Sequence, residues 1–194
     1  GPPVFPRPGD VVPADVHAAL AALDRPRKHY QKYYATPEAD RDLCQCPQGI
    51  SDFLRGYFHS KSADWSGNDP HPLGAWEAAA LAEMPTYYIM DADQNMAETA
   101  ADYMPGPDEI AANNWLSDAE LAVYAGEFSR TGFQGGLNCY RCRFVEEMLD
   151  ELRLFGGKTI DRPACFIAGD KDWGPHQVPG ALGRMQERAF TQMK

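Results

Sequence analysis

The sequence predicts an α/β protein that is built mostly from helices and has one buried strand near its C-terminal end. Three local patterns support this prediction. Residues 48–61 place apolar side chains at helical spacing, and the segment after residue 117 begins with a helix-capping signal. Residues 163–169 form a short apolar run between a proline and a glycine, which is typical of a strand covered on both faces.

Most of the chain carries helical signals. In the helix predicted over 48–61, one apolar face is formed by Ile50, Phe53, Leu54, Tyr57 and Phe58. Ser117 and Glu120 form a capping box, so a second helix begins after Ser117 and its apolar positions continue to Phe128. We expect further helices over 14–23, 96–104, 137–152 and 180–193, and an extended segment over 86–92.

The strand predicted over 163–169 needs partners. A strand buried on both faces must pair the backbone N–H and C=O groups along both of its edges. The rest of the sequence is helical in pattern and supplies few residues for neighbouring strands. We therefore expect this strand either to pair with a sheet from outside the 194 residues or to remain exposed at an edge.

The charge of the chain argues against two classes of partner. It has 18 Lys and Arg against 28 Asp and Glu, which gives a formal net charge of −10. Nucleic acids and anionic membrane surfaces both need a basic face, so we expect neither as a partner. No apolar run approaches the roughly 18 residues of a membrane-spanning helix, and the proline-rich residues 1–13 do not have the pattern of a secretory signal.

The five cysteines favour free thiols over a disulfide framework. Their odd number in a chain of this length favours a reducing compartment, so we predict a cytoplasmic location. Cys44 with Cys46 and Cys139 with Cys142 leave one alternative open, a zinc site with four thiolate ligands. The first spacing is tighter than the usual zinc knuckle, and the second pair lies in a predicted helix. We therefore expect buried free thiols and no bound metal.

Three segments resemble parts of one known family. The segment 131–141, with the sequence TGFQGGLNCYR, resembles the segment that joins the helical cap to the core in epoxide hydrolases of the α/β-hydrolase superfamily. Residues 163–173 resemble the penultimate core strand and the acid that follows it, and the tyrosine-rich residues 29–34 resemble the first tyrosine element of the cap. All three occur in the order that the family has.

The resemblance implies an α/β-hydrolase fold that is represented here mainly by its helical cap, with one core strand and helix. It divides the chain into a linker over 1–13, a cap over 14–136 and a return to the core over 137–194. The family's nucleophilic aspartate and its histidine have no counterpart: the sequence contains no Gly-x-Ser-x-Gly or Gly-x-Asp-x-Gly motif, and no histidine follows His176. We therefore expect the isolated chain to be inactive.

The resemblance also assigns roles to individual residues. Tyr140 and Tyr30 would donate hydrogen bonds to the epoxide oxygen, a task that suits neutral phenols, although Tyr33 and Tyr34 compete with Tyr30 for this role. Asp172 would orient the triad histidine, and Asp170 is the alternative. Phe133 and Trp173 would line the substrate pocket. Cys139 departs from the family, which usually has a large aromatic residue before its second tyrosine. The reaction needs no cofactor.

Other functions remain open at this point. Within the superfamily, an ester hydrolase or a dehalogenase is possible, although a tyrosine pair argues against the dehalogenase, which holds halide with Trp or Asn donors. From other classes, the chain could be a non-catalytic binding protein or a zinc-stabilised helical module. As partners we expect a small apolar substrate such as an epoxide, together with either a second copy of the chain or core segments that these residues lack.

Overall fold

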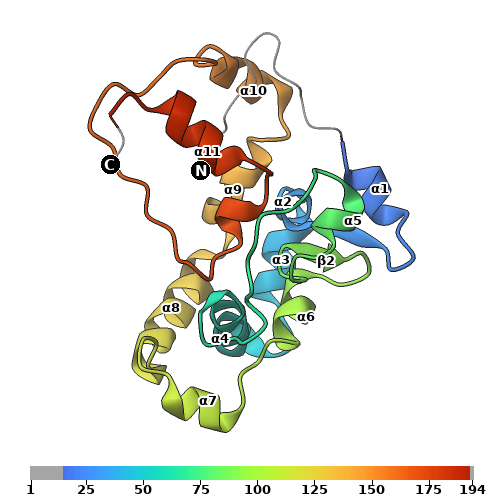
Figure 1. The fold of residues 1–194 in the computed structure, drawn as a ribbon. Helices are drawn as coiled ribbons and strands as arrows, with labels where there is room; N and C mark the ends of the chain where they lie inside the picture. The colour runs from blue at the N-terminus through green and yellow to red at the C-terminus, as the bar shows by residue number, and fades with distance from the viewer. Residues whose placement is uncertain (1–14, 193–194) are drawn as a thin grey trace.

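A computed structural model describes residues 15–192 and shows a helical body followed by a loosely packed C-terminal segment (Figure 1). The body begins with α1 His17–Ala21, β1 Arg27–His29, α2 Tyr30–Tyr34, α3 Glu38–Cys44, α4 Gly49–Lys61, α5 Ala78–Leu81, β2 Ile89–Asp91, α6 Met96–Ala101 and α7 Pro107–Ala112. The chain continues with α8 Asp118–Thr131, α9 Gln134–Arg141, α10 Glu146–Arg153, the 3-10 helix η1 Gly174–His176, α11 Ala181–Arg184 and the π-helix η2 Met185–Ala189.

Helix α4 lies at the centre of the body, between α6 and α8 (Figure 1). It confirms the helix predicted over 48–61, and Phe53 and Leu54 on its apolar face are buried. Each such side chain contributes roughly 1.5–3 kcal/mol when it leaves water. Gly56 allows α6 to approach closely, because a Cβ atom at this position would collide with the backbone carbonyl oxygen of Ala100.

The capping box predicted before α8 is present. The Ser117 side chain accepts a hydrogen bond from the Glu120 amide, and the Glu120 carboxylate accepts one from the Ser117 amide at 2.8 Å. These two bonds satisfy N–H groups that a helix start otherwise leaves without partners. Gly132, with φ +69, ends α8 and turns the chain toward α9.

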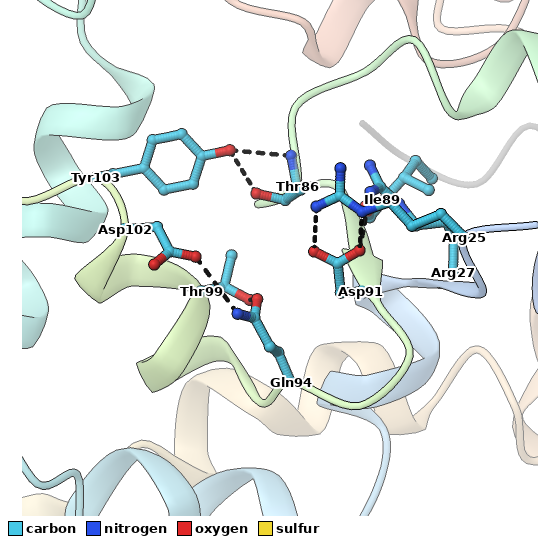
Figure 2. Close-up of polar contacts among 9 residues, drawn as sticks. All are labelled: Arg25, Arg27, Thr86, Ile89, Asp91, Gln94, Thr99, Asp102 and Tyr103. Carbon is cyan, nitrogen blue, oxygen red and sulfur yellow. Dashed lines mark hydrogen bonds and ion pairs between the residues drawn. The ribbon is translucent and has the colours of Figure 1, made fainter.

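A two-stranded antiparallel sheet anchors the other side of the body. Strand β1 pairs with β2 in the register Arg27↔Asp91, Lys28↔Met90 and His29↔Ile89, within the segment predicted to be extended over 86–92. Figure 2 shows the Asp91 carboxylate held by two guanidinium groups. Arg25 binds it with two bonds of 2.6 Å, and the buried Arg27 binds it at 3.0 Å while donating to the Ile89 carbonyl.

Two of the predicted C-terminal helices are shorter than expected. The helix predicted over 137–152 is two helices, because α9 ends at Arg141 and α10 begins at Glu146. The helix predicted over 180–193 is also divided, into α11 and the π-helix η2, and residues 193–194 lie outside the described part.

The strand predicted over 163–169 is wrong for the described residues. This segment forms no regular ladder, and it is mostly exposed rather than buried, with Ile167 88% accessible. Its backbone contacts include one bond from the Ala164 amide to the Gln192 carbonyl, next to an isolated parallel bridge between Ile160 and Phe190. The physical reason is the lack of a neighbouring strand within residues 15–192 to accept the ladder bonds.

The hydrophobic core is confined to the helical body, apart from one residue. Its members run from Val16 to Leu137, and the next buried apolar side chain along the chain is Trp173. Trp173 therefore attaches the C-terminal segment to the body. The linker predicted over 1–13 lies outside the described residues, and the cap and core boundaries predicted from the sequence stay a prediction. No helix found between residues 15 and 192 is both long and apolar enough to cross a membrane.

Replacing Asp91 tests how much the two-stranded sheet contributes to the stability of the chain. Asp91→Asn removes the negative charge that compensates the buried Arg27, so we expect the free energy of unfolding to fall by about 2–4 kcal/mol. Urea denaturation followed by circular dichroism measures the change. The matched control is Arg25→Met, which removes the exposed partner of the same carboxylate and should cost about 0–1 kcal/mol. Equal losses in the two variants would contradict the buried role of Arg27.

The same carboxylate should make the stability of the two-stranded sheet depend on pH. Burial raises the pKa of Asp91, but the hydrogen bonds and charges of Arg25 and Arg27 outweigh this effect and hold the pKa below its ordinary value. The folded state therefore binds fewer protons than the unfolded state in acid, and the stabilisation is present above the unfolded pKa and is lost as pH falls through the folded one. The stability difference between wild type and Asp91→Asn should shrink over this acid range.

Candidate active site

The two-stranded sheet of β1 and β2 positions Tyr30. It is the first residue of α2 and directly follows β1, and its amide donates to the Tyr88 carbonyl at 2.9 Å. His29 lies just before α2, accepts a bond from the Gln31 amide through its Nδ1 and stacks on the Tyr30 ring with the centroids 5.1 Å apart. The backbone pairing and the stacked ring together fix the direction of the Tyr30 side chain.

Tyr140 comes from a distant part of the chain and meets Tyr30. It lies on α9, which packs against α2, and its ring centroid is 5.8 Å from that of Tyr30 and 5.1 Å from that of Tyr34. Tyr30 also contacts the ring of Tyr88 at 5.2 Å. We call the group that these contacts extend to the tyrosine cluster; its members are Tyr30, Tyr34, Tyr57, Tyr87, Tyr88 and Tyr140.

The hydroxyl groups of the cluster differ in their partners. Tyr34 donates to the Tyr57 hydroxyl at 3.2 Å, so its proton is engaged. Tyr30 accepts from the Gln31 side chain at 3.1 Å, which leaves its own proton available to another acceptor. The Tyr140 hydroxyl has no hydrogen-bond partner among residues 15–192 in the structure. Two phenols with available protons thus have their rings in contact.

Burial keeps several phenols of the tyrosine cluster neutral. It raises the pKa of Tyr140, Tyr34 and Tyr88 well above the ordinary value of a tyrosine, and it raises the pKa of Tyr57 to about 12. The charge of Asp172 adds to the effect at Tyr88. A phenol that stays protonated at neutral pH is a hydrogen-bond donor without a charge, so the cluster can donate to a developing negative charge.

Asp172 is connected to the tyrosine cluster through Tyr88. The Tyr88 hydroxyl donates to the Asp172 carboxylate at 3.1 Å, and the Gly174 amide donates to the same oxygen at 2.8 Å. The neighbouring Trp173 is buried and packs edge-on against His71 with the ring centroids 5.0 Å apart. Asp170, the alternative acid, is exposed.

Phe133 lies in the core, and the side chain of Phe53 lies between it and the tyrosine cluster. Its ring stacks on Phe128 of α8, with centroids 4.3 Å apart and an interplanar angle of 8°, and it meets Phe53 of α4 edge-on. Phe53 in turn contacts Tyr57 of the cluster. The role of Phe133 and Trp173 in a substrate pocket stays a prediction.

The sequence-based interpretation missed three residues of this site. Tyr57 was placed on the apolar face of α4 without a functional role, and Tyr88 was only part of the extended segment. Lys61, one helical turn after Tyr57, was not considered, although its ammonium group lies over the rings of both tyrosines. The Tyr87-Tyr88 pair beside an i, i+4 pair of Tyr57 and Lys61 was the available signal.

The zinc alternative finds no support in the described residues. All five cysteines are free thiols, with Cys46 buried and Cys139 and Cys165 exposed. Between residues 15 and 192, no group of three or more His, Cys, Asp or Glu side chains could hold a metal ion. The expectation of buried free thiols is wrong for Cys139 and Cys165.

Comparison with known proteins gives a consistent result. Epoxide hydrolase A of Mycobacterium tuberculosis is 48% identical over 71 residues, which cover 37% of this chain and 21% of that protein. Epoxide hydrolase B of the same organism is 29% identical over 193 residues, which cover 95% of this chain and 51% of the relative. No protein-family model matches the chain.

The solved structures agree on the fold. An epoxide hydrolase from an endophytic Streptomyces superimposes with a TM-score of 0.63 and 22% identity, over 94% of this chain and 50% of the other. Potato epoxide hydrolase I gives a TM-score of 0.57 and 22% identity, over 93% of this chain and 48% of its own. The chain shares the fold of these two epoxide hydrolases over nearly its whole length, and in sequence it is similar to the curated epoxide hydrolases. It spans about half the length of these relatives.

The shared fold accounts for the helix-rich structure. The few strands and the many short helices are consistent with the cap region of an α/β-hydrolase fold, as the sequence predicted. The tyrosine cluster draws its members from α2, α4, α9 and the turn before β2.

The tyrosine cluster should be visible in a spectrophotometric titration. Because burial raises the pKa of Tyr34, Tyr88 and Tyr140, the folded chain should hold these phenol protons above pH 10, where the unfolded chain releases them. The free energy of unfolding should therefore fall as pH rises through and above about 10. Absorbance at the phenolate band, in buffer and in guanidinium chloride, measures both. Titration of all nine tyrosines near pH 10 in the folded chain would contradict a buried cluster.

Proposed function

We propose that the chain provides the cap and the acid of an epoxide hydrolase, in which a carboxylate nucleophile from outside these 194 residues opens the epoxide ring. The observation that supports this best is the contact between Tyr30 and Tyr140, two residues from distant segments with available phenol protons. An epoxide oxygen becomes an alkoxide when the ring opens, and two neutral donors aimed at it stabilise that charge. The names of the curated relatives, all epoxide hydrolases, point to the same substrate class.

Each residue has a specific part in this proposal. The Tyr30 and Tyr140 hydroxyls donate to the epoxide oxygen while the nucleophile attacks carbon and forms an ester. Asp172 holds a histidine, also from outside these residues, in the orientation that activates water against that ester. Tyr88 in turn holds Asp172. Phe133 and Trp173 are proposed to shape the apolar pocket, directly or by supporting its walls.

The domain boundaries belong to the same proposal: residues 14–136 are the cap and 137–194 return to the core. The exposed apolar side chains of the C-terminal segment support it, since Leu154 is 73%, Phe155 62% and Ile167 88% accessible. Surfaces of this kind are ordinarily covered. We propose that the rest of an α/β core covers them, on the same chain or on another. Free cysteines agree with a cytoplasmic location.

Activity measurements on two forms of the protein test the proposal. The isolated 194-residue chain should hydrolyse neither styrene-oxide-type substrates nor simple esters above background, because it contains neither nucleophile elbow nor triad histidine. In the longer natural protein, identified by an intact mass well above 21.5 kDa, Tyr140→Phe and Tyr30→Phe should each lower kcat about 100- to 1000-fold.

The matched control is Tyr124→Phe, which removes an exposed phenol of α8 outside the tyrosine cluster and should leave the rate unchanged. Turnover by the isolated chain that Asp172→Ala abolishes would show that the chain needs no outside residues. Retention of the full epoxide rate in both tyrosine variants would overturn the donor assignment, and a faster ester reaction that ignores them would point to an ester hydrolase.

A further inference from the structure

Lys61 occupies a cage of three aromatic rings. Its Nζ atom lies 4.2 Å from the ring centroid of Tyr87, 4.5 Å from that of Tyr88 and 4.8 Å from that of Tyr57. Two of these rings come from the turn before β2 and the third from α4 itself, so the cage exists only when the two segments pack together. A cation over the face of an aromatic ring is attracted by the ring's quadrupole, and the attraction strengthens when water is excluded.

One ring of the cage leads directly to the candidate acid. The Tyr88 phenol, whose face is against the ammonium group, donates its hydroxyl hydrogen to Asp172 at 3.1 Å. The Tyr88 side chain thus contacts the cation through its ring and the carboxylate through its hydroxyl group. Asp172 belongs to the C-terminal segment, which has few other anchors in the helical body.

The charged groups around Lys61 support this pairing. Asp64, which shares a cavity of about 360 Å³ with Lys61, already accepts the Trp115 indole hydrogen at 2.8 Å. Burial lowers the pKa of Lys61 to about 8, and the charge of Asp172 acts against this effect. At neutral pH the lysine is therefore largely protonated, and Asp172 is the carboxylate that the cage reaches through the Tyr88 hydroxyl.

We propose that Lys61 is a positioning residue for Asp172: its ammonium group, held on the rings of Tyr57, Tyr87 and Tyr88, fixes the Tyr88 phenol and balances the Asp172 carboxylate. The physical contact does not depend on the reaction. Its significance for catalysis rests on the proposed function, in which Asp172 is the acid that orients the histidine.

The experiment follows the Asp172 carboxyl carbon by NMR during an acid titration of the 194-residue chain, with the signal assigned by its loss in Asp172→Asn. In Lys61→Met, the midpoint should rise by about half a pH unit or more, since the compensating cation is gone. In Lys61→Arg it should stay near the wild-type value, because a guanidinium group also rests on aromatic faces. An unchanged midpoint in Lys61→Met would overturn the proposal.

Two further variants separate this role from a general effect of charge. Lys171→Met removes an exposed lysine next to Asp172 in sequence, and solvent screening should make its shift much smaller. Tyr88→Phe keeps the ring but removes the donor, so it should also raise the midpoint. The shift of the double variant with Lys61→Met should be less than the sum of the single shifts, because both act on one contact. Equal shifts in Lys171→Met and Lys61→Met would contradict the cage.

A reciprocal measurement covers the case in which Lys61→Met does not fold. The Lys61 side-chain carbon next to the ammonium group should titrate near pH 8 in the wild-type chain, and Asp172→Asn should lower that midpoint. No change would overturn the proposal. None of these titrations uses a substrate, so a chain that shows the shifts while its longer form lacks epoxide activity would overturn only the proposed function.

Discussion

Tyr88 joins three segments that are far apart in the sequence. Its carbonyl accepts a hydrogen bond from the Tyr30 amide. This bond holds the first residue of α2 beside the turn that precedes β2. Its hydroxyl group donates to Asp172, 84 residues later. The buried phenol has to find a hydrogen-bond acceptor, and the C-terminal segment supplies it. The rest of the site depends on this requirement, because Tyr30 and Asp172 are both placed by the same residue.

The two-stranded sheet of β1 and β2 makes this arrangement possible. Electrostatic as well as hydrophobic interactions stabilise this sheet. Asp91 would be an unfavourable charge at a partly buried strand end, but Arg25 and Arg27 compensate it. The cation Lys61 plays a similar part at the turn before β2, where aromatic faces take the place of a carboxylate. A chain with a net charge of −10 thus places some of its few cations where the fold brings acidic or π-electron-rich groups together.

The local features were the most predictable from the sequence. The apolar period of α4 and the capping box of α8 both appear where the pattern placed them, because each depends on residues within one or two helical turns. The resemblance to epoxide hydrolases identified Tyr30, Tyr140 and Asp172 as candidates. It could not supply Tyr57, Tyr88 or Lys61, whose positions depend on how α4 packs against the turn before β2.

The sequence by itself determined the apolar period of α4, the capping box of α8 and the similarity to epoxide hydrolases, since these follow from short-range patterns and from residues in a fixed order. The tertiary structure alone decided which phenols meet, which carry available protons and which carboxylate they hold. It also decided that 163–169 forms no strand in residues 15–192. The reason is common to all of these: hydrogen bonds and ring contacts between distant segments depend on packing, and a strand exists only when another strand lies beside it.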